Sequence, residues 1–105
     1  MITDERANEA FHWLENNTVK IGRTRADMER TEILRKRARK RAFIEAPDGS
    51  VAAKEAYAEI HADVIKADDA YITAVTEFET TKAKQQLESI ALDVWRTECA
   101  NRRRA

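Results

Sequence analysis

The chain has 105 residues, with 19 Lys or Arg, 19 Asp or Glu and a formal net charge of zero. This length predicts one domain, residues 1–105, and two glycines, one proline and 36% charged residues favour long helices over a sheet fold. The single cysteine excludes an intramolecular disulfide, and no apolar run reaches the roughly 18 residues of a membrane span. The acidic opening MITDERANEA is unlike a secretory signal, so we expect a cytoplasmic protein that does not enter a membrane.

The first expected element begins at Thr3, whose hydroxyl can cap a helix ahead of two carboxylates. Apolar side chains then recur every seven residues, which predicts a helical stripe. The stripe comprises Ala7, Leu14, Ile21 and Met28. The stretch NNTVKIGRT disturbs it, and Thr18 within that stretch is a candidate cap for a second helix. Two interpretations remain open: abutting helices over about 3–17 and 19–45, or one kinked helix over 3–45.

The sequence APDGS at 46–50 is the one convincing turn, because Pro, Asp-Gly and a capping Ser fall within five residues. After it we expect a short Ala-rich helix over about 50–60 and a long helix over about 62–102. Such a long helix buries its apolar stripe only against a neighbour. The predicted fold is therefore all-α: an elongated helical hairpin, similar to a coiled coil, that assembles into a homo-oligomer.

The zero net charge conceals segments of opposite sign. Residues 20–41 hold ten bases and three acids, a net charge of +7, whereas residues 42–81 hold nine acids and two bases, a net charge of −7. One interpretation of RKRARKR at 35–41, which we call the basic run, is therefore pairing with the acidic segment across the hairpin. However, six bases in seven positions point all around a helix, and one neighbour covers only one side. The second interpretation is a surface for the phosphates of a nucleic acid.

The candidate nucleic-acid contacts are the bases of this run and of a second cluster, Arg102–Arg104, which we call the C-terminal cluster. Together they are Arg35, Lys36, Arg37, Arg39, Lys40, Arg41, Arg102, Arg103 and Arg104. Phe43 and Trp95 could stack on unpaired bases, but both lie on apolar stripes, and the core is the favoured place for them.

No pattern in the sequence indicates catalysis, a cofactor or a metal. The two histidines and Cys99 do not stand at metal-ligand spacings, and the chain lacks a glycine-rich phosphate loop. The acidic pair at 68–69 occupies adjacent helical positions, which do not face each other. We therefore expect a protein that is not an enzyme and needs no cofactor.

The stretch ALDVWRTECANRRR at 91–104 resembles the closing motif of a group of small phage-encoded helical proteins. In that motif an apolar helix ends in Trp-Arg and, a few polar residues later, in Ala-Asn-Arg-Arg. The stretches ANEAFHWLENNT and GSVAAKEAYAEI are also similar to that group, which has two helices, a short Ala-rich helix and a long helix. The same order of elements resembles the phage recombination mediators of the UvsY type. Those are ring-forming proteins that bind single-stranded DNA and help to load a recombinase onto strands coated by single-strand-binding protein.

The resemblance implies an accessory role in phage DNA recombination. The expected partners are single-stranded DNA, further copies of the chain in an oligomer or ring, and a recombinase or single-strand-binding protein. The main alternative is a helical protein-interaction scaffold that does not bind nucleic acid. A small DNA-binding regulator is a third interpretation, and it lacks the compact helix-turn-helix signal.

Overall fold

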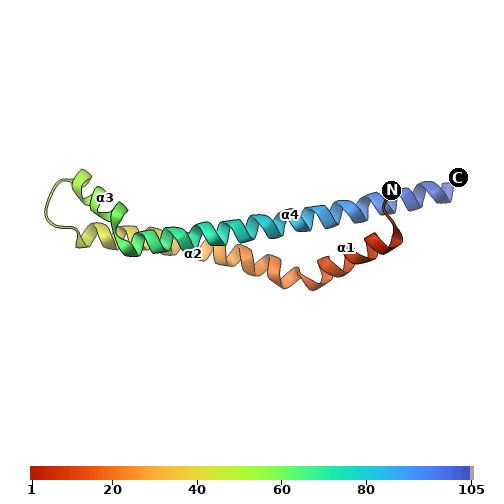
Figure 1. The fold of residues 1–105 in the computed structure, drawn as a ribbon, viewed down its shortest axis with the longest axis horizontal. Helices are drawn as coiled ribbons and strands as arrows, with labels where there is room; N and C mark the ends of the chain where they lie inside the picture. The colour runs from red at the N-terminus through yellow and green to blue at the C-terminus, as the bar shows by residue number, and fades with distance from the viewer. Residues whose placement is uncertain (105) are drawn as a thin grey trace. The chain divides into compact units, whose positions relative to one another are not determined.

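The computed structural model describes residues 1–104, in which the regular secondary structure is entirely helical. Four helices follow one another along the chain (Figure 1): α1 (Asp4–Asn16), α2 (Thr18–Glu45), α3 (Val51–Ile60) and α4 (Ala62–Arg104). The all-α prediction is confirmed. None of the helices in the described part is long and apolar enough to cross a membrane.

Three helices begin at side chains that accept a hydrogen bond from the first turn. Thr3 Oγ1 accepts from the Arg6 amide at 3.0 Å to begin α1, and Ser50 Oγ accepts from the Ala53 amide at 3.1 Å to begin α3. His61 Nδ1 accepts from the Asp63 amide at 3.1 Å ahead of α4. These local contacts explain why the helices start where they do.

The junction between α1 and α2 differs from the expectation for Thr18. Its hydroxyl donates to the carbonyl of Leu14 at 3.0 Å, so it satisfies the end of α1 and does not cap α2. Asn17 adds a second bond of the same kind, from Nδ2 to the carbonyl of Trp13 at 2.8 Å. The Trp13 carbonyl also accepts from the Asn17 backbone amide at 3.0 Å, so both side chains add bonds to the last turn of α1, where a helix leaves carbonyls short of partners.

The described chain forms two compact units. Unit 1 comprises Met1–Arg23 and Glu79–Ala105, and unit 2 comprises Thr24–Phe78. Within unit 1, α1 runs antiparallel to the C-terminal part of α4: Trp95 Nε1 donates to Asp4 Oδ1 at 2.8 Å, and Arg6 binds Glu88 farther along (Figure 1).

Within unit 2, α2 and the first part of α4 are also antiparallel, because Arg35 lies against Tyr71 and Arg39 against Asp68. The turn and α3 lie between them in sequence. Small side chains allow the helices to approach closely, and the core consists of Ala42, Ala58 and Val64, with Ala38 packed against it.

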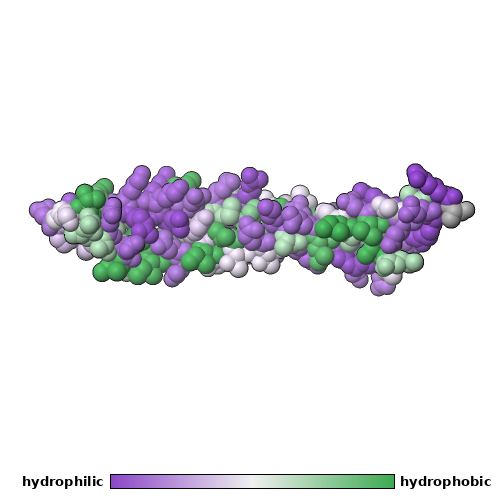
Figure 2. Space-filling model, turned by 90° about the horizontal axis from the view of Figure 1, so that it is seen from above, coloured by the Kyte–Doolittle hydropathy of each residue, from purple (hydrophilic) through white to green (hydrophobic). Residues whose placement is uncertain are grey.

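The apolar core is small compared with the number of large apolar side chains. Of the described residues with a large apolar side chain, Val64 alone is almost completely buried. Many others are exposed to solvent, and Figure 2 shows apolar patches between hydrophilic ones on the face that it draws. They are Met1, Phe11, Val19, Ile33, Leu34, Ile44, Val51, Ile60, Ile65, Ile72, Leu87, Ile90 and Val94. Exposed apolar surface of this extent is typical of chains that bury it against a partner.

Candidate nucleic-acid interface

The basic run lies on α2 in unit 2, and three of its six cations are held by neighbours. The Arg35 guanidinium lies over the Tyr71 ring, 4.4 Å from the centroid, Lys36 Nζ is 3.3 Å from a Glu32 carboxylate oxygen, and Arg39 is 3.3 Å from Asp68 Oδ2. The other Asp68 oxygen is buried without a hydrogen-bond partner in the described chain, so Arg39 is the cation on which this acid depends. Pairing across the two helices therefore accounts for part of the run.

The other three cations of the run, Arg37, Lys40 and Arg41, are exposed and make no hydrogen bond or ion pair within residues 1–104. Their spacing of three and four residues places them on one side of α2. The exposed Ile33 and Ile44 lie near the same side, before and after them. The structure thus leaves a compact group of three exposed cations, which we call the free triad, while the other three cations of the basic run are held by neighbours.

Arg41 also lines a groove of about 320 Å³ between α2 and α4, together with small or apolar side chains such as Leu34 and Ala38. Lys66 of α4 lines the same groove and adds a fourth cation to it. Asp63 of α4 lines it as well, so the groove itself is less positive than the face of α2 that carries Arg37 and Lys40. The outer face of α2 is therefore the stronger place for an anion.

The C-terminal cluster belongs to unit 1, so the two predicted basic sites lie in different units. Arg102 Nη2 lies 3.4 Å from Cys99 Sγ, and Arg103 and Arg104 have no hydrogen-bond or ion-pair partner among the described residues. All three are exposed at the C-terminal end of α4, where the helix dipole favours positive charge. Their position at the end of α4 is explained by stabilisation of the helix alone, and their role as phosphate contacts stays a prediction.

The two aromatic candidates occupy different surroundings. Phe43 is half-buried, and the Lys54 ammonium is 5.8 Å from its ring centroid, so an internal cation already uses that ring. Trp95 is also only half-buried, although we expected it in the core, because its indole N–H reaches Asp4 near the open end of α1. One side of its ring system is therefore accessible.

Unit 1 contains a buried ionic centre that the sequence did not predict. Glu88 is 1% exposed and receives two hydrogen bonds from Arg6, one of them 2.9 Å long, while Lys84 Nζ is 2.7 Å from Oε1. These cations outweigh the effect of burial and lower the pKa of Glu88 from 4.5 to about 2, and the Arg6 hydrogen bonds are the largest cause. The same bonds raise the pKa of Arg6. Both oxygens of this buried carboxylate are bonded to cations, so the centre holds α1 to α4 and leaves no free carboxylate for chemistry.

The described residues contain no group of three or more His, Cys, Asp or Glu side chains able to hold a metal ion. Comparison with protein-family models, curated proteins and solved structures found no match to this chain. The resemblance to UvsY-type mediators therefore rests on the order of the helices and the layout of charge along the chain, and not on any of these comparisons.

Lys66 and Arg96 are two cations near the candidate surfaces that sequence reasoning left out of the site. Lys66 could have been found from the hairpin register, because an antiparallel pair through the turn at 46–50 brings it opposite Arg41. Arg96 immediately follows Trp95 in the quoted motif, and it lies beside an aromatic pocket. Each of these cations lines a pocket between two helices that are distant in the sequence, and counting charges along the chain does not show such pairings.

Proposed function

We propose that this protein is a non-enzymatic, homo-oligomeric accessory protein that binds single-stranded DNA, and that the free triad Arg37, Lys40 and Arg41 supplies its main phosphate contacts. The observation that carries the proposal is that these three cations are adjacent, exposed and unpaired, while their neighbours in the run are held. An unpaired cationic face is maintained at a cost in self-repulsion, which an anionic ligand relieves.

The expected binding does not depend on base sequence, because Lys and Arg on an open helix face contact phosphates and not base edges. Each phosphate neutralised on a single strand contributes about 0.7 to the slope of log affinity against log salt. Three contacts per subunit therefore give a slope of roughly 2, which is weak binding for one chain. Several subunits acting on one strand would raise the affinity by avidity.

The exposed apolar side chains support the oligomer in this proposal. A chain whose buried core consists mainly of alanine gains little burial energy alone, and a second copy would cover side chains such as Ile60 and Ile72. The same observation favours the second candidate function, a protein-interaction scaffold in which the basic run only sets the pairing of helices. The recombination setting, with a recombinase or single-strand-binding protein as partner, is supported by the sequence resemblance alone.

The test is fluorescence anisotropy of a labelled single strand with the wild-type protein and with a variant carrying Arg37→Gln, Lys40→Gln and Arg41→Gln. We expect salt-sensitive binding by the wild type and a loss of at least about tenfold in the variant, with circular dichroism and oligomer size unchanged. The matched control is Arg25→Gln together with Arg30→Gln, which removes exposed cations of the same helix that already pair with Glu29 and Asp27. An absence of binding by the wild type at low salt, or a triad variant that changes oligomer size, favours the scaffold.

A further inference from the structure

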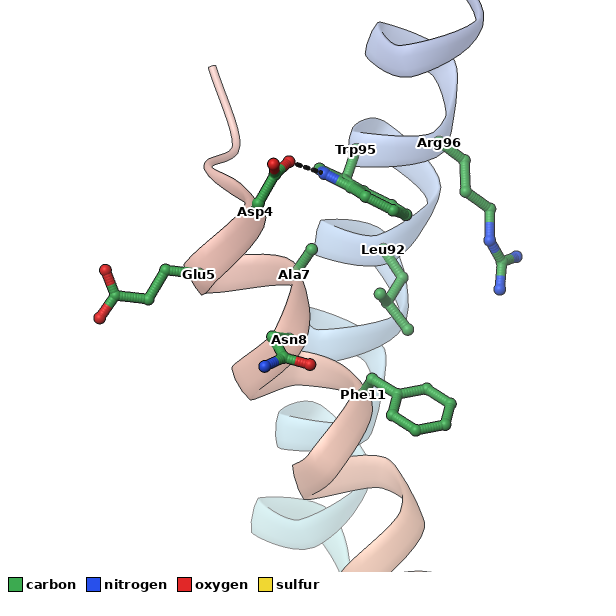
Figure 3. Close-up of a pocket in the computed structure, with 8 residues that line it drawn as sticks. All are labelled: Asp4, Glu5, Ala7, Asn8, Phe11, Leu92, Trp95 and Arg96. Carbon is green, nitrogen blue, oxygen red and sulfur yellow. Dashed lines mark hydrogen bonds between the residues drawn. The ribbon is translucent and has the colours of Figure 1, made fainter.

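Unit 1 contains an open pocket of about 710 Å³ between α1 and the C-terminal part of α4 (Figure 3). Phe11 of α1 and Leu92 and Trp95 of α4 form its apolar wall, and Arg96 stands at its edge. Phe11 is 52% exposed, so an aromatic ring here faces solvent and not the core. An accessible aromatic wall beside a cation indicates a binding site more than a packing defect.

The Trp95 ring is fixed in place before any ligand arrives. Its Nε1 donates to Asp4 Oδ1 at 2.8 Å, which sets the orientation of the ring plane. The buried Ala7, one turn farther along α1, faces α4 in the same part of the pocket. A ring held in this way loses little conformational entropy when a flat ligand stacks on it. The pocket is therefore preorganised for stacking.

The charges around the pocket are separated between its two sides. In Figure 3 the side chains of Phe11, Leu92 and Arg96 extend to the same side, whereas the Glu5 carboxylate extends to the opposite side of α1. Arg96 is 69% exposed, and its ion pair with Asp93 is long, at 3.7 Å. Asp4, the other acid at the pocket, is occupied by the indole. The aromatic side is consequently the cationic side.

A second cation continues this side along α4. Arg103 follows Arg96 by seven residues, so it lies on the same side of the helix about 10.5 Å farther along. It has no hydrogen-bond or ion-pair partner within the described residues. Together the two arginines form a short cationic path that begins at the aromatic wall.

We propose that this pocket binds one unpaired base of single-stranded DNA, stacked on the aromatic wall of Phe11 and Trp95, with the flanking phosphates at Arg96 and Arg103. The proposal rests on the proposed function for its ligand, and it adds a second, base-dependent contact in unit 1 to the phosphate contacts in unit 2. Stacking on aromatic side chains accepts every base, because every base has a flat face. A protein side chain from a second copy is the competing occupant, and the cations beside the rings favour the nucleic acid.

The chain offers a direct optical test, because Trp13 and Trp95 are its two tryptophans. In a Trp13→Phe protein, Trp95 is the single source of tryptophan fluorescence. Its emission is followed during titration with oligothymidylate of about 20 nucleotides and with an abasic strand of equal length. We expect the thymidine strand to quench Trp95 and to bind at least about fivefold more tightly than the abasic strand. Equal affinity for both strands and no quenching would overturn the base pocket.

Two substitutions separate stacking from general electrostatics. Phe11→Ala is expected to weaken thymidine-strand binding about fivefold or more and to leave abasic-strand binding unchanged, and Leu87→Ala, at a similarly exposed position of α4, is its control. Arg96→Gln should weaken binding of both strands, whereas Arg25→Gln, an equally exposed paired arginine, should not.

The outcomes distinguish this proposal from the proposed function. If the wild type binds neither strand, the proposed function fails and the pocket proposal fails with it. If the free-triad substitutions abolish binding while Phe11→Ala and Arg96→Gln have no effect, the pocket proposal alone is wrong. If Phe11→Ala instead changes the oligomer size without affecting DNA affinity, a second copy occupies the pocket.

Discussion

Each of the two units of this protein is stabilised internally by a different kind of interaction. In unit 1 the central contact is ionic: Glu88, almost completely buried, is matched by Arg6 and Lys84. In unit 2 the central contact is apolar, with Val64 among alanines, and the ion pair across the helices, Arg39 with Asp68, lies near the surface. One chain of helices thus uses a buried charge in one unit and small side chains in the other.

The difference shows that net charge says little about where charges matter. A surface ion pair contributes about 0–1 kcal/mol, whereas removal of one partner from a buried pair leaves an unmatched charge and costs several times more. Unit 2 contains the conspicuous basic run, yet its stability should be insensitive to most of those bases. Unit 1 is less charged in sequence, yet it depends on one carboxylate.

The largest expected effect is that of Glu88→Ala, which leaves Arg6 and Lys84 without their shared anion and opens a cavity. We expect the free energy of unfolding to fall by about 3 kcal/mol, measured by urea denaturation followed by circular dichroism. Val64→Ala is the counterpart in unit 2 and should cost about 2 kcal/mol, because it removes the one large apolar side chain that is almost fully buried in the described chain. A Glu88→Ala protein as stable as the wild type would remove the basis of the comparison.

A change of pH should affect unit 1 through the same carboxylate. The pKa of Glu88 is lowered from 4.5 to about 2 in the folded protein, so its contribution is fully present above pH 4.5 and is lost as the pH falls toward 2. The full loss is roughly 2 kcal/mol, a value reduced because Arg6 and Lys84 remain in contact with water. Urea midpoints of the wild type and of Glu88→Gln should therefore converge between about pH 4.5 and 2. A constant difference over that range would contradict this assignment.

The local features of the fold were predictable because they depend on neighbouring residues. The capping roles of Thr3 and Ser50 and the turn at 46–50 follow from a few side chains in sequence. Thr18 stands at the start of α2 as expected, but its hydroxyl does not cap that helix. A hydroxyl both donates and accepts, and only the backbone path shows that this one donates to Leu14 at the end of α1.

The candidate sites were less predictable because they depend on which helix faces which. The sequence showed six bases in the run, but the division into held and free cations required the position of Asp68 and Tyr71 on α4. Glu88 was missed for the same reason, because its partner Arg6 is 82 positions earlier in the chain. Trp95 was expected in the core from its stripe, and its bond to Asp4 explains its half-exposed position.

The smallest expected effect distinguishes held from free cations within unit 2. Arg39→Gln should lower the free energy of unfolding by up to about 1 kcal/mol, because it removes the one cation bound to Asp68. That cation binds Oδ2, and the other carboxylate oxygen, Oδ1, is buried without a hydrogen-bond partner in the described chain. Arg37→Gln, two residues earlier on the same helix, should change it by less than about 0.5 kcal/mol, because Arg37 contacts no acid in the described chain. The two values are compared by urea denaturation at low salt, where surface pairs contribute most. An equal loss of unfolding free energy in both variants would mean that held and free cations of the run are equivalent. The free triad would then not be a distinct binding surface.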